Sequence, residues 1–124
     1  MTLDSARGRI VMFGGVPGGV TTNNRPVGET WEFDGTRWEF ASLAGPVARY
    51  GAGMAFDAAR GQSVLFGGAA RSTAPNALPD VVTSAGDTWT WDGEYWNEVA
   101  TTGPSARTYP AMVYDPVREM TYLY

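Results

Sequence analysis

The sequence contains an internal repeat, which limits the chain to architectures built from several similar units. Residues 4–15 match residues 57–68 at eight of twelve positions, and residues 28–49 match residues 86–107 at ten of twenty-two. A third copy starts at Asp115 and runs to the end of the sequence. Corresponding positions lie 53 or 58 residues apart. Any fold assigned to this chain must therefore contain several similar units.

Each unit is predicted to consist of β-strands joined by tight turns. The segment around Trp31 alternates apolar and polar residues with a period of two, and so does its copy around Trp89. This period is typical of a strand with one buried face. Asp34-Gly35 and Asp92-Gly93 supply the positive-φ residues that tight hairpins need. No segment shows sustained helical periodicity, so the sequence predicts an all-β fold.

The pattern predicts nine strands in three pieces of the chain. The pieces are residues 1–45 with three strands, 46–103 with four and 104–124 with two. The predicted strands are residues 10–13, 30–34, 37–41, 50–56, 63–66, 88–92, 95–100, 108–114 and 120–124.

The order of the motifs resembles that of a known family. In both complete copies an apolar strand ends in Gly-Gly, and a variable segment, [Glu/Asp]-Thr-Trp, six residues, a second Trp and Gly-Pro-x-Ala-Arg follow. This order resembles bacterial kelch-repeat proteins, in the wider group that includes the central domain of galactose oxidase. The resemblance covers essentially the whole chain. Many kelch units carry a His three residues after the Arg, where this sequence has Ala52 and Pro110.

The resemblance implies a β-propeller, in which each blade is an antiparallel sheet of four strands. A propeller closes with four blades or more, and this sequence holds about two and a quarter. We therefore expect the chain to be part of a larger propeller, completed by further blades or by self-association.

Two sets of repeated residues are expected to be structural. The glycine pairs are expected to let neighbouring backbone approach closely. Binding of an anion is the alternative, but it requires a following helix, which is not predicted. The repeated tryptophans are expected to pack between blades, with carbohydrate stacking as the alternative. These residues are Gly14, Gly15, Gly67 and Gly68, and Trp31, Trp38, Trp89 and Trp96.

Arg49 and Arg107 recur at the entrance to corresponding strands. A buried guanidinium can tie neighbouring segments together through carbonyl groups or through a carboxylate. We expect this structural role, with Glu29 and Asp87 as the candidate acids. The alternative is a guanidinium that binds a ligand.

The two long variable segments, residues 16–27 and 69–85, are predicted loops at one end of the sheets. In a four-stranded meander the connections alternate between the two ends, and the other end holds only tight turns. Rigid scaffolds commonly bind ligands through such divergent loops, although solvated loops without a ligand are the alternative. The candidate ligand-binding residues are Asn23, Asn24, Arg25, Arg71, Asn76 and Asp80.

The composition excludes several classes of site. The chain has no Cys and no His, so it holds no disulfide, no metal site with thiolate or imidazole ligands and no Ser-His-Asp triad. The copper site of galactose oxidase needs His and a Tyr-Cys crosslink, which this chain lacks. The nine basic residues are scattered and the net charge is −4, which argues against nucleic acid as a partner. No apolar stretch is long enough to span a membrane.

These observations favour a non-catalytic kelch-repeat module that presents its loops to a protein or glycan, with no cofactor. The alternative is a piece of a propeller enzyme or carbohydrate-binding protein whose catalytic residues lie in other blades. A surface or adhesion module is a third possibility. The resemblance to bacterial kelch proteins suggests an extracellular or cell-surface location.

Overall fold

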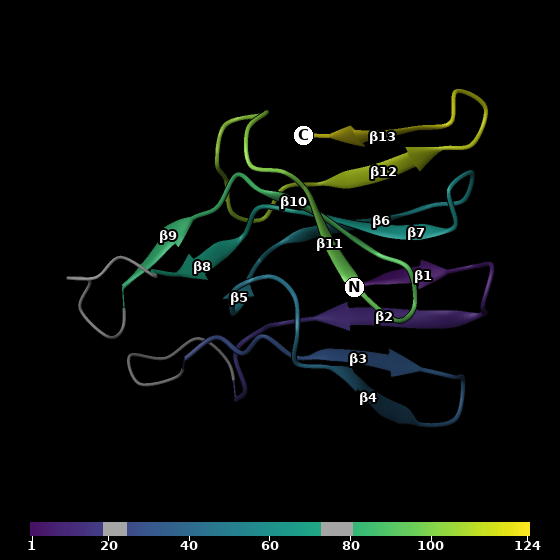
Figure 1. Ribbon diagram of the computed structural model, residues 1–124, viewed down its shortest axis with the longest axis horizontal. Helices are drawn as coiled ribbons and strands as arrows, with labels where there is room; N and C mark the ends of the chain where they lie inside the picture. The colour runs from purple at the N-terminus through teal and green to yellow at the C-terminus, as the bar shows by residue number, and fades with distance from the viewer. Residues whose placement is uncertain (19–24, 73–80) are drawn as a thin grey trace.

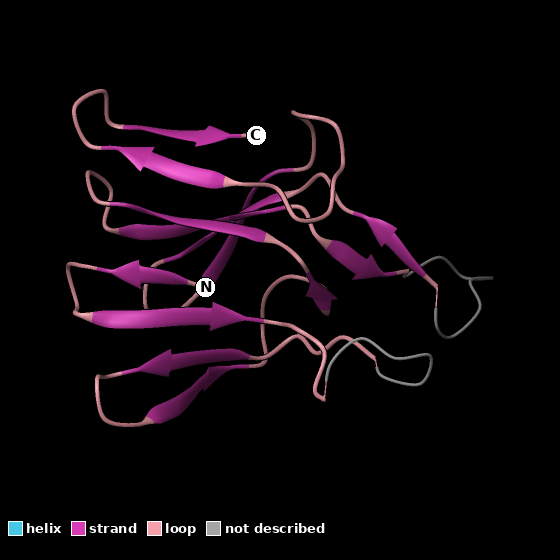
Figure 2. Cartoon of the chain, turned by 180° about the vertical axis from the view of Figure 1, so that it is seen from behind, coloured by secondary structure: helices cyan, strands magenta, loops and turns pink. Residues whose placement is uncertain are grey.

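The computed structural model describes residues 1–18, 25–72 and 81–124. Over these ranges the chain is all-β, without a helix, and its strands form antiparallel sheets of two to four strands (Figures 1 and 2). The all-β prediction is therefore confirmed.

The strands form four sheets. The first sheet has the order β1-β2-β3-β4, and the second has the order β6-β7-β10-β11. The third sheet is the pair β12-β13, and a side sheet has the order β5-β8-β9. The strands of the first sheet are β1 (Thr2–Asp4), β2 (Arg9–Phe13), β3 (Thr30–Phe33) and β4 (Trp38–Ser42). Those of the second are β6 (Gly53–Asp57), β7 (Gln62–Phe66), β10 (Thr88–Trp91) and β11 (Trp96–Ala100). The remaining strands are β5 (Arg49–Tyr50), β8 (Ala69–Arg71), β9 (Val82–Ser84), β12 (Met112–Asp115) and β13 (Met120–Leu123).

The first, second and third sheets are layered, with their first strands next to one another. Strand β1 lies beside β6, and β6 lies beside β12. The turns that join β1 to β2, β3 to β4, β6 to β7 and β12 to β13 all lie at the right-hand end of Figure 1, and the side sheet lies at the opposite end. We call these the turn end and the loop end.

The layer between the first and second sheets is built around tryptophans of the second sheet. Trp91 is 1% exposed, and its indole N–H donates to Glu32 of the first sheet. Trp96 packs edge-on against Phe13 with ring centroids 5.2 Å apart, and its N–H donates to the Thr30 hydroxyl. Because each indole combines a large apolar area with one satisfied donor, the two rings fix both the spacing and the register of the layers.

Three details of the strand prediction are wrong. The first sheet has four strands because Thr2–Asp4 pairs with β2, so the expected three is one too few. The predicted strand over residues 50–56 is divided between two sheets, because the chain turns at Gly51 with φ +63°. The predicted strand over residues 108–114 begins only at Met112, after Tyr109 adopts φ +59°.

The segment over residues 69–85, predicted as a loop, contains strands β8 and β9. Strand β8 pairs with β9 on one side and with β5 on the other. The prediction missed them because three-residue strands rich in Ala and Thr lack a long alternating pattern.

The turns between the first two strands of the first, second and third sheets share an ion-paired Asp-x-x-Arg motif. The pairs are Asp4–Arg7 at 2.6 Å, Asp57–Arg60 at 2.7 Å and Asp115–Arg118 at 2.9 Å. In each turn the same aspartate also accepts a backbone N–H of the motif, so the turn is closed by its own side chains.

Each glycine pair lies against the backbone of the next unit. The N–H of Gly15 donates to the carbonyl of Arg49 at 2.8 Å, and that of Gly68 donates to the carbonyl of Arg107 at 2.9 Å. Gly14 has φ +66°, and a Cβ at this position would collide with the Arg49 carbonyl oxygen. Only glycine permits both this conformation and this close approach.

We expect Gly14→Ala to lower the free energy of unfolding by about 3 kcal/mol, because it adds a backbone collision to a positive φ. Gly8→Ala is the matched control, since Gly8 has φ +64° but open space around its Cβ position. It is expected to cost about 1 kcal/mol. Chemical denaturation measures the free energy of unfolding of both variants. Equal losses of stability would show that the close approach to the Arg49 carbonyl does not contribute to the cost of Gly14→Ala.

Candidate functional site

The candidate site is a cavity at the loop end, between the side sheet and the second sheet. Its volume is about 480 Å³. Charged and small side chains line it together with backbone groups, so it offers both polar and apolar contacts. The lining residues are Val47, Arg49, Ala70, Arg71, Ser72, Thr83, Ala85, Gly86, Asp87 and Thr101.

One wall of this cavity is an ion pair between the buried Arg49 and the partly buried Asp87. The guanidinium of Arg49 donates to both carboxylate oxygens of Asp87, at 2.6 and 2.7 Å, and also to the carbonyl of Gly67 at 3.0 Å. Arg49 is 2% exposed. Since its own carbonyl accepts the N–H of Gly15, this residue connects the first sheet to the second. The bidentate geometry holds the wall of the cavity rigid.

The charge of Asp87 is stabilised by its neighbours. Burial acts to raise the pKa of Asp87, but hydrogen bonds from Arg49 and from the Trp89 indole, together with the charge of Arg49, outweigh it and lower that pKa below its usual value. The Asp87 carboxylate is therefore ionised at neutral pH, and the Arg49 guanidinium compensates its charge.

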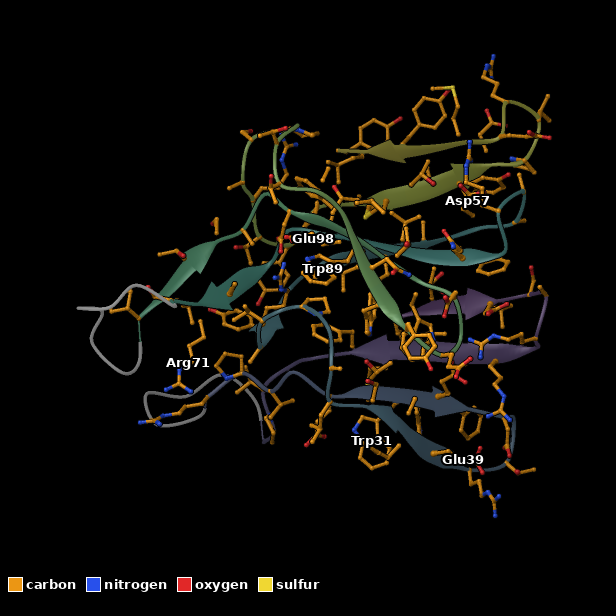
Figure 3. The ribbon with its side chains drawn as sticks, viewed as in Figure 1. Trp31, Glu39, Asp57, Arg71, Trp89 and Glu98 are labelled. Atoms are coloured by element: carbon orange, nitrogen blue, oxygen red, sulfur yellow. The ribbon has the colours of Figure 1, made fainter. Side chains whose placement is uncertain are left out.

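Arg71 is the free cation at this cavity among the described residues. Its backbone N–H donates to the carbonyl of Ala48, which fixes the end of β8. Its side chain is exposed and projects from β8 at the loop end (Figure 3), and no described residue forms an ion pair or hydrogen bond with its guanidinium. A ligand that enters the cavity would therefore find five unused N–H donors on a fixed strand.

The other predicted ligand-binding residues are placed only in part. Arg25 is exposed. Asn23, Asn24, Asn76 and Asp80 lie outside the described residues. The structure thus brings Arg71 to a cavity and does not test the remaining predictions.

The two repeated arginines have different surroundings. Arg107 occupies the position that corresponds to Arg49, but its guanidinium donates only to the carbonyl and the hydroxyl of Ser105, each at 3.0 Å. No carboxylate contacts it within the part of the chain that the structure describes. Arg49 therefore has the contacts expected of a structural fork, whereas among the described residues the Arg107 guanidinium bonds only to Ser105.

The four predicted tryptophans also divide into two pairs. Trp89 and Trp96 belong to the face of the second sheet that covers the first sheet. Trp31 and Trp38 lie on the opposite face of the first sheet, where Trp38 is 42% exposed. Trp31 donates its indole N–H to Glu29, as Trp89 does to Asp87. The two copies thus share the indole contact to a preceding acid. They differ in packing, because Trp96 lies against the first sheet whereas Trp38 is 42% exposed.

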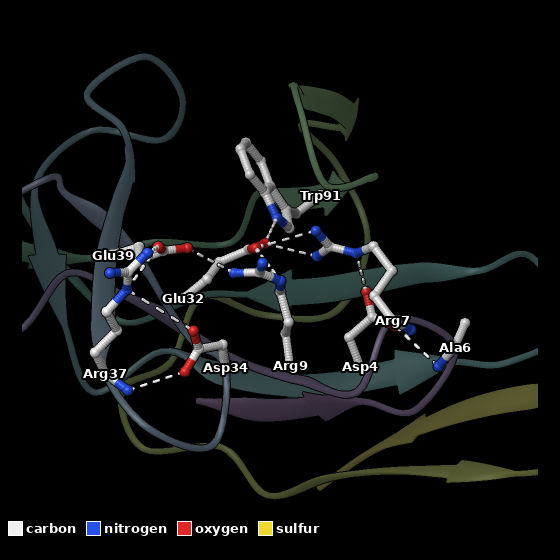
Figure 4. A network of polar contacts seen from close by, with 9 residues as sticks. All are labelled: Asp4, Ala6, Arg7, Arg9, Glu32, Asp34, Arg37, Glu39 and Trp91. Carbon is white, nitrogen blue, oxygen red and sulfur yellow. Dashed lines mark hydrogen bonds and ion pairs between the residues drawn. The ribbon is translucent and has the colours of Figure 1, made fainter.

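The sequence prediction missed a second polar cluster, which lies near the turn end (Figure 4). Glu32 is 6% exposed and accepts hydrogen bonds from both terminal nitrogens of Arg7 and from the Trp91 indole. Arg9 bonds to the neighbouring Glu39 at 3.0 Å. The sequence signal that could have revealed this cluster was a break in the repeat, because Thr90 stands where the first copy has Glu32. The Glu32 carboxylate ties two sheets together, since it accepts hydrogen bonds from Arg7 of the first sheet and Trp91 of the second.

No group of three or more His, Cys, Asp or Glu residues is placed to hold a metal ion within residues 1–18, 25–72 and 81–124. Over the same ranges, no helix has the length and apolar character needed to cross a membrane.

Comparison of the chain with protein-family models finds no match, and comparison with curated proteins finds none either. The kelch resemblance accordingly rests on the repeated motifs of this sequence, and it remains a prediction.

We expect Asp87→Asn to lower the free energy of unfolding by about 3 kcal/mol at neutral pH, because it leaves the buried Arg49 charge without a carboxylate. Glu29→Gln is the matched control, since its carboxylate accepts one hydrogen bond from Trp31. That substitution should cost less than about 1 kcal/mol. Chemical denaturation at pH 7 checks the order, and a larger loss for Glu29→Gln would contradict it.

The same pair predicts a pH dependence. The pKa of Asp87 is lower in the folded chain than in the unfolded one, so its contribution is complete above the unfolded value of about 4 and is lost as the pH falls through the folded value. The stability difference between the natural chain and Asp87→Asn should therefore shrink steadily below about pH 4. A difference that stays constant from pH 7 to pH 3 would show that the ion pair is not its source.

Proposed function

We propose that this chain is a non-catalytic interaction module built from consecutive blades of a kelch-type β-propeller, and that it binds a protein or glycan partner at its loop end. Two properties of the structure support the propeller interpretation. Both complete units are four-stranded antiparallel sheets in simple strand order, and the first strands β1, β6 and β12 lie next to one another. Blades of a propeller converge in this way on a common axis.

The binding role rests on one observation: the guanidinium of Arg71, which no described residue engages, lies beside a cavity with a rigid wall. Arg49 and Asp87 neutralise each other, so Arg71 determines the charge that a ligand meets. The partner expected from this chemistry carries a carboxylate or sulfate group, either on an acidic glycan or on an acidic side chain of a protein. Neutral hydroxyls of a sugar could bind to the carbonyls and hydroxyls of the lining.

The turn end is less suited to this role. Its exposed arginines are mostly committed to internal pairs, such as Arg60 with Asp57 and Arg118 with Asp115. A ligand there would have to compete with a carboxylate three residues away in the chain. The difference between paired and unpaired arginines therefore favours the loop end.

We expect Arg71→Ala to weaken binding of an acidic ligand at least tenfold, because one desolvated charge-assisted hydrogen bond is worth roughly 1.5–3 kcal/mol. The natural chain is first screened against an array of sulfated, uronic-acid and neutral glycans and against a library of acidic peptides. Affinities of the hits are then measured by calorimetry.

Arg118→Ala is the control variant, because it removes another exposed arginine, which lies at the turn end and is paired with Asp115. Binding that falls with Arg71→Ala and not with Arg118→Ala supports the proposal. Binding that is indifferent to Arg71, or that depends on Arg118, would place the interaction surface elsewhere.

A further inference from the structure

A tyrosine with a strained backbone stands where the preceding copy of the repeat has glycine. Tyr109 adopts φ +59°, and the residue that corresponds to it in the second unit is Gly51, with φ +63°. Both stand two positions after a repeated arginine, so the repeated backbone requires the left-handed conformation at this point. A glycine adopts that conformation freely, whereas a tyrosine adopts it at a cost. The side chain of Tyr109 must therefore contribute something that a glycine cannot.

The ring of Tyr109 is held in place without being buried by the described residues. The edge with carbons Cδ1 and Cε1 lies over Gly51, where a Cβ would come within 2.9 Å of Cε1. The backbone N–H of Tyr109 donates to the Gly51 carbonyl at 2.6 Å. Tyr109 is nevertheless 71% exposed. So small a buried area does little to offset a strained backbone, and strained residues of this kind cluster at functional sites.

A second tyrosine and two hydroxyl groups surround this ring. The rings of Tyr50 and Tyr109 have centroids 6.2 Å apart and are inclined by 55°. The hydroxyls of Ser84 and Thr108 form a hydrogen bond of 3.2 Å, and Thr108 directly precedes Tyr109. In the side sheet, Tyr50 is opposite Ala69 and Ala69 is opposite Ser84. Because directly opposite residues share a face, the Tyr50 ring and the Ser84 hydroxyl lie on the same face of that sheet.

This face is not the one that lines the loop-end cavity. The cavity is lined by Arg49, Ala70 and Thr83, which form the neighbouring cross-strand row of the side sheet. Successive residues of a strand point to opposite faces, so the row that starts at Tyr50 points away from the cavity. The two tyrosines and the two hydroxyls therefore form a second surface at the loop end.

We propose that Tyr109, together with Tyr50, Thr108 and Ser84, is a stacking site for a neutral sugar ring. The apolar C–H face of the sugar covers the Tyr109 ring, and the sugar hydroxyls bond to Ser84 and Thr108, which can both donate and accept. All four side chains are uncharged phenols or alcohols, so they favour a neutral sugar over an acidic ligand. The site goes beyond the function proposed for the cavity and does not depend on Arg71.

The test measures sugar binding to the full 124-residue chain by calorimetry. The probes are soluble neutral oligosaccharides of glucose, galactose, mannose and N-acetylglucosamine. At least one should bind saturably, and Tyr109→Asn should weaken that binding at least tenfold because it removes the stacking ring. Tyr109→Trp keeps an aromatic face and should retain binding. Binding of none of these sugars, or binding that is unchanged in Tyr109→Asn, would overturn the proposal.

A stability measurement distinguishes a binding role from a packing role. Asparagine tolerates a positive φ better than tyrosine does, so Tyr109→Asn should leave the midpoint of chemical denaturation unchanged or raise it. Glu119→Asn is the matched control, because Glu119 is the other described non-glycine residue with a positive φ, +53°, and it lies at the turn end. This control should leave sugar affinity unchanged. A midpoint that falls with Tyr109→Asn would show that the ring serves packing, and would overturn the proposal.

The two loop-end surfaces can be separated by exchanging the variants. Arg71→Ala should leave the affinity for the neutral sugar unchanged, and Tyr109→Asn should leave the affinity for an acidic ligand unchanged. Loss of acidic-ligand binding in neither variant would count against the cavity alone. Sugar binding that depends on Arg71 and not on Tyr109 would overturn the stacking site. Binding of peptides that requires Tyr109, without binding of any neutral sugar, would assign this surface to a protein partner and would also overturn it.

Discussion

The arrangement of the sheets depends on one buried ion pair and the backbone around it. The guanidinium of Arg49 binds the Asp87 carboxylate and the Gly67 carbonyl of the second sheet, while the Arg49 carbonyl receives the N–H of Gly15. One residue thus holds the end of the first sheet against the second. The charge survives burial because the carboxylate accepts two of its N–H groups, and separating them would leave an uncompensated charge inside the fold.

The same interaction links the scaffold to the candidate site. Arg49 and Asp87 form a wall of the loop-end cavity, and Arg71 lies on the adjacent strand β8. Because the pair is internally neutral and fully bonded, it contributes shape rather than net charge to the cavity. Arg71 supplies the charge. This division between a rigid neutral wall and a cation that no described residue engages is suited to recognition of an anionic group.

The two internal units show which features of a repeat are fixed and which are free to change. The glycine pairs, the Asp-x-x-Arg turns and the indole contact to a preceding acid recur with nearly the same distances. Glu32 is an exception, since its counterpart Thr90 has no carboxylate and cannot form an ion pair with an arginine. The additional carboxylate ties Arg7 and Trp91 into the layer between the first two sheets. A repeated framework can therefore carry interactions that differ from layer to layer.

The sequence by itself determined the all-β class, the longer strands, the tight turns and the close approach at Gly14 and Gly67, because these depend on local φ preference and on a period of two. Only the tertiary structure showed that Gly51 divides a predicted strand and that Trp91 is buried deeper than the repeated tryptophans. Likewise, Arg49 and Arg107 look alike in sequence and differ in their partners. Burial and pairing depend on which segments meet across the layers, and that is a property of the folded chain rather than of any single motif.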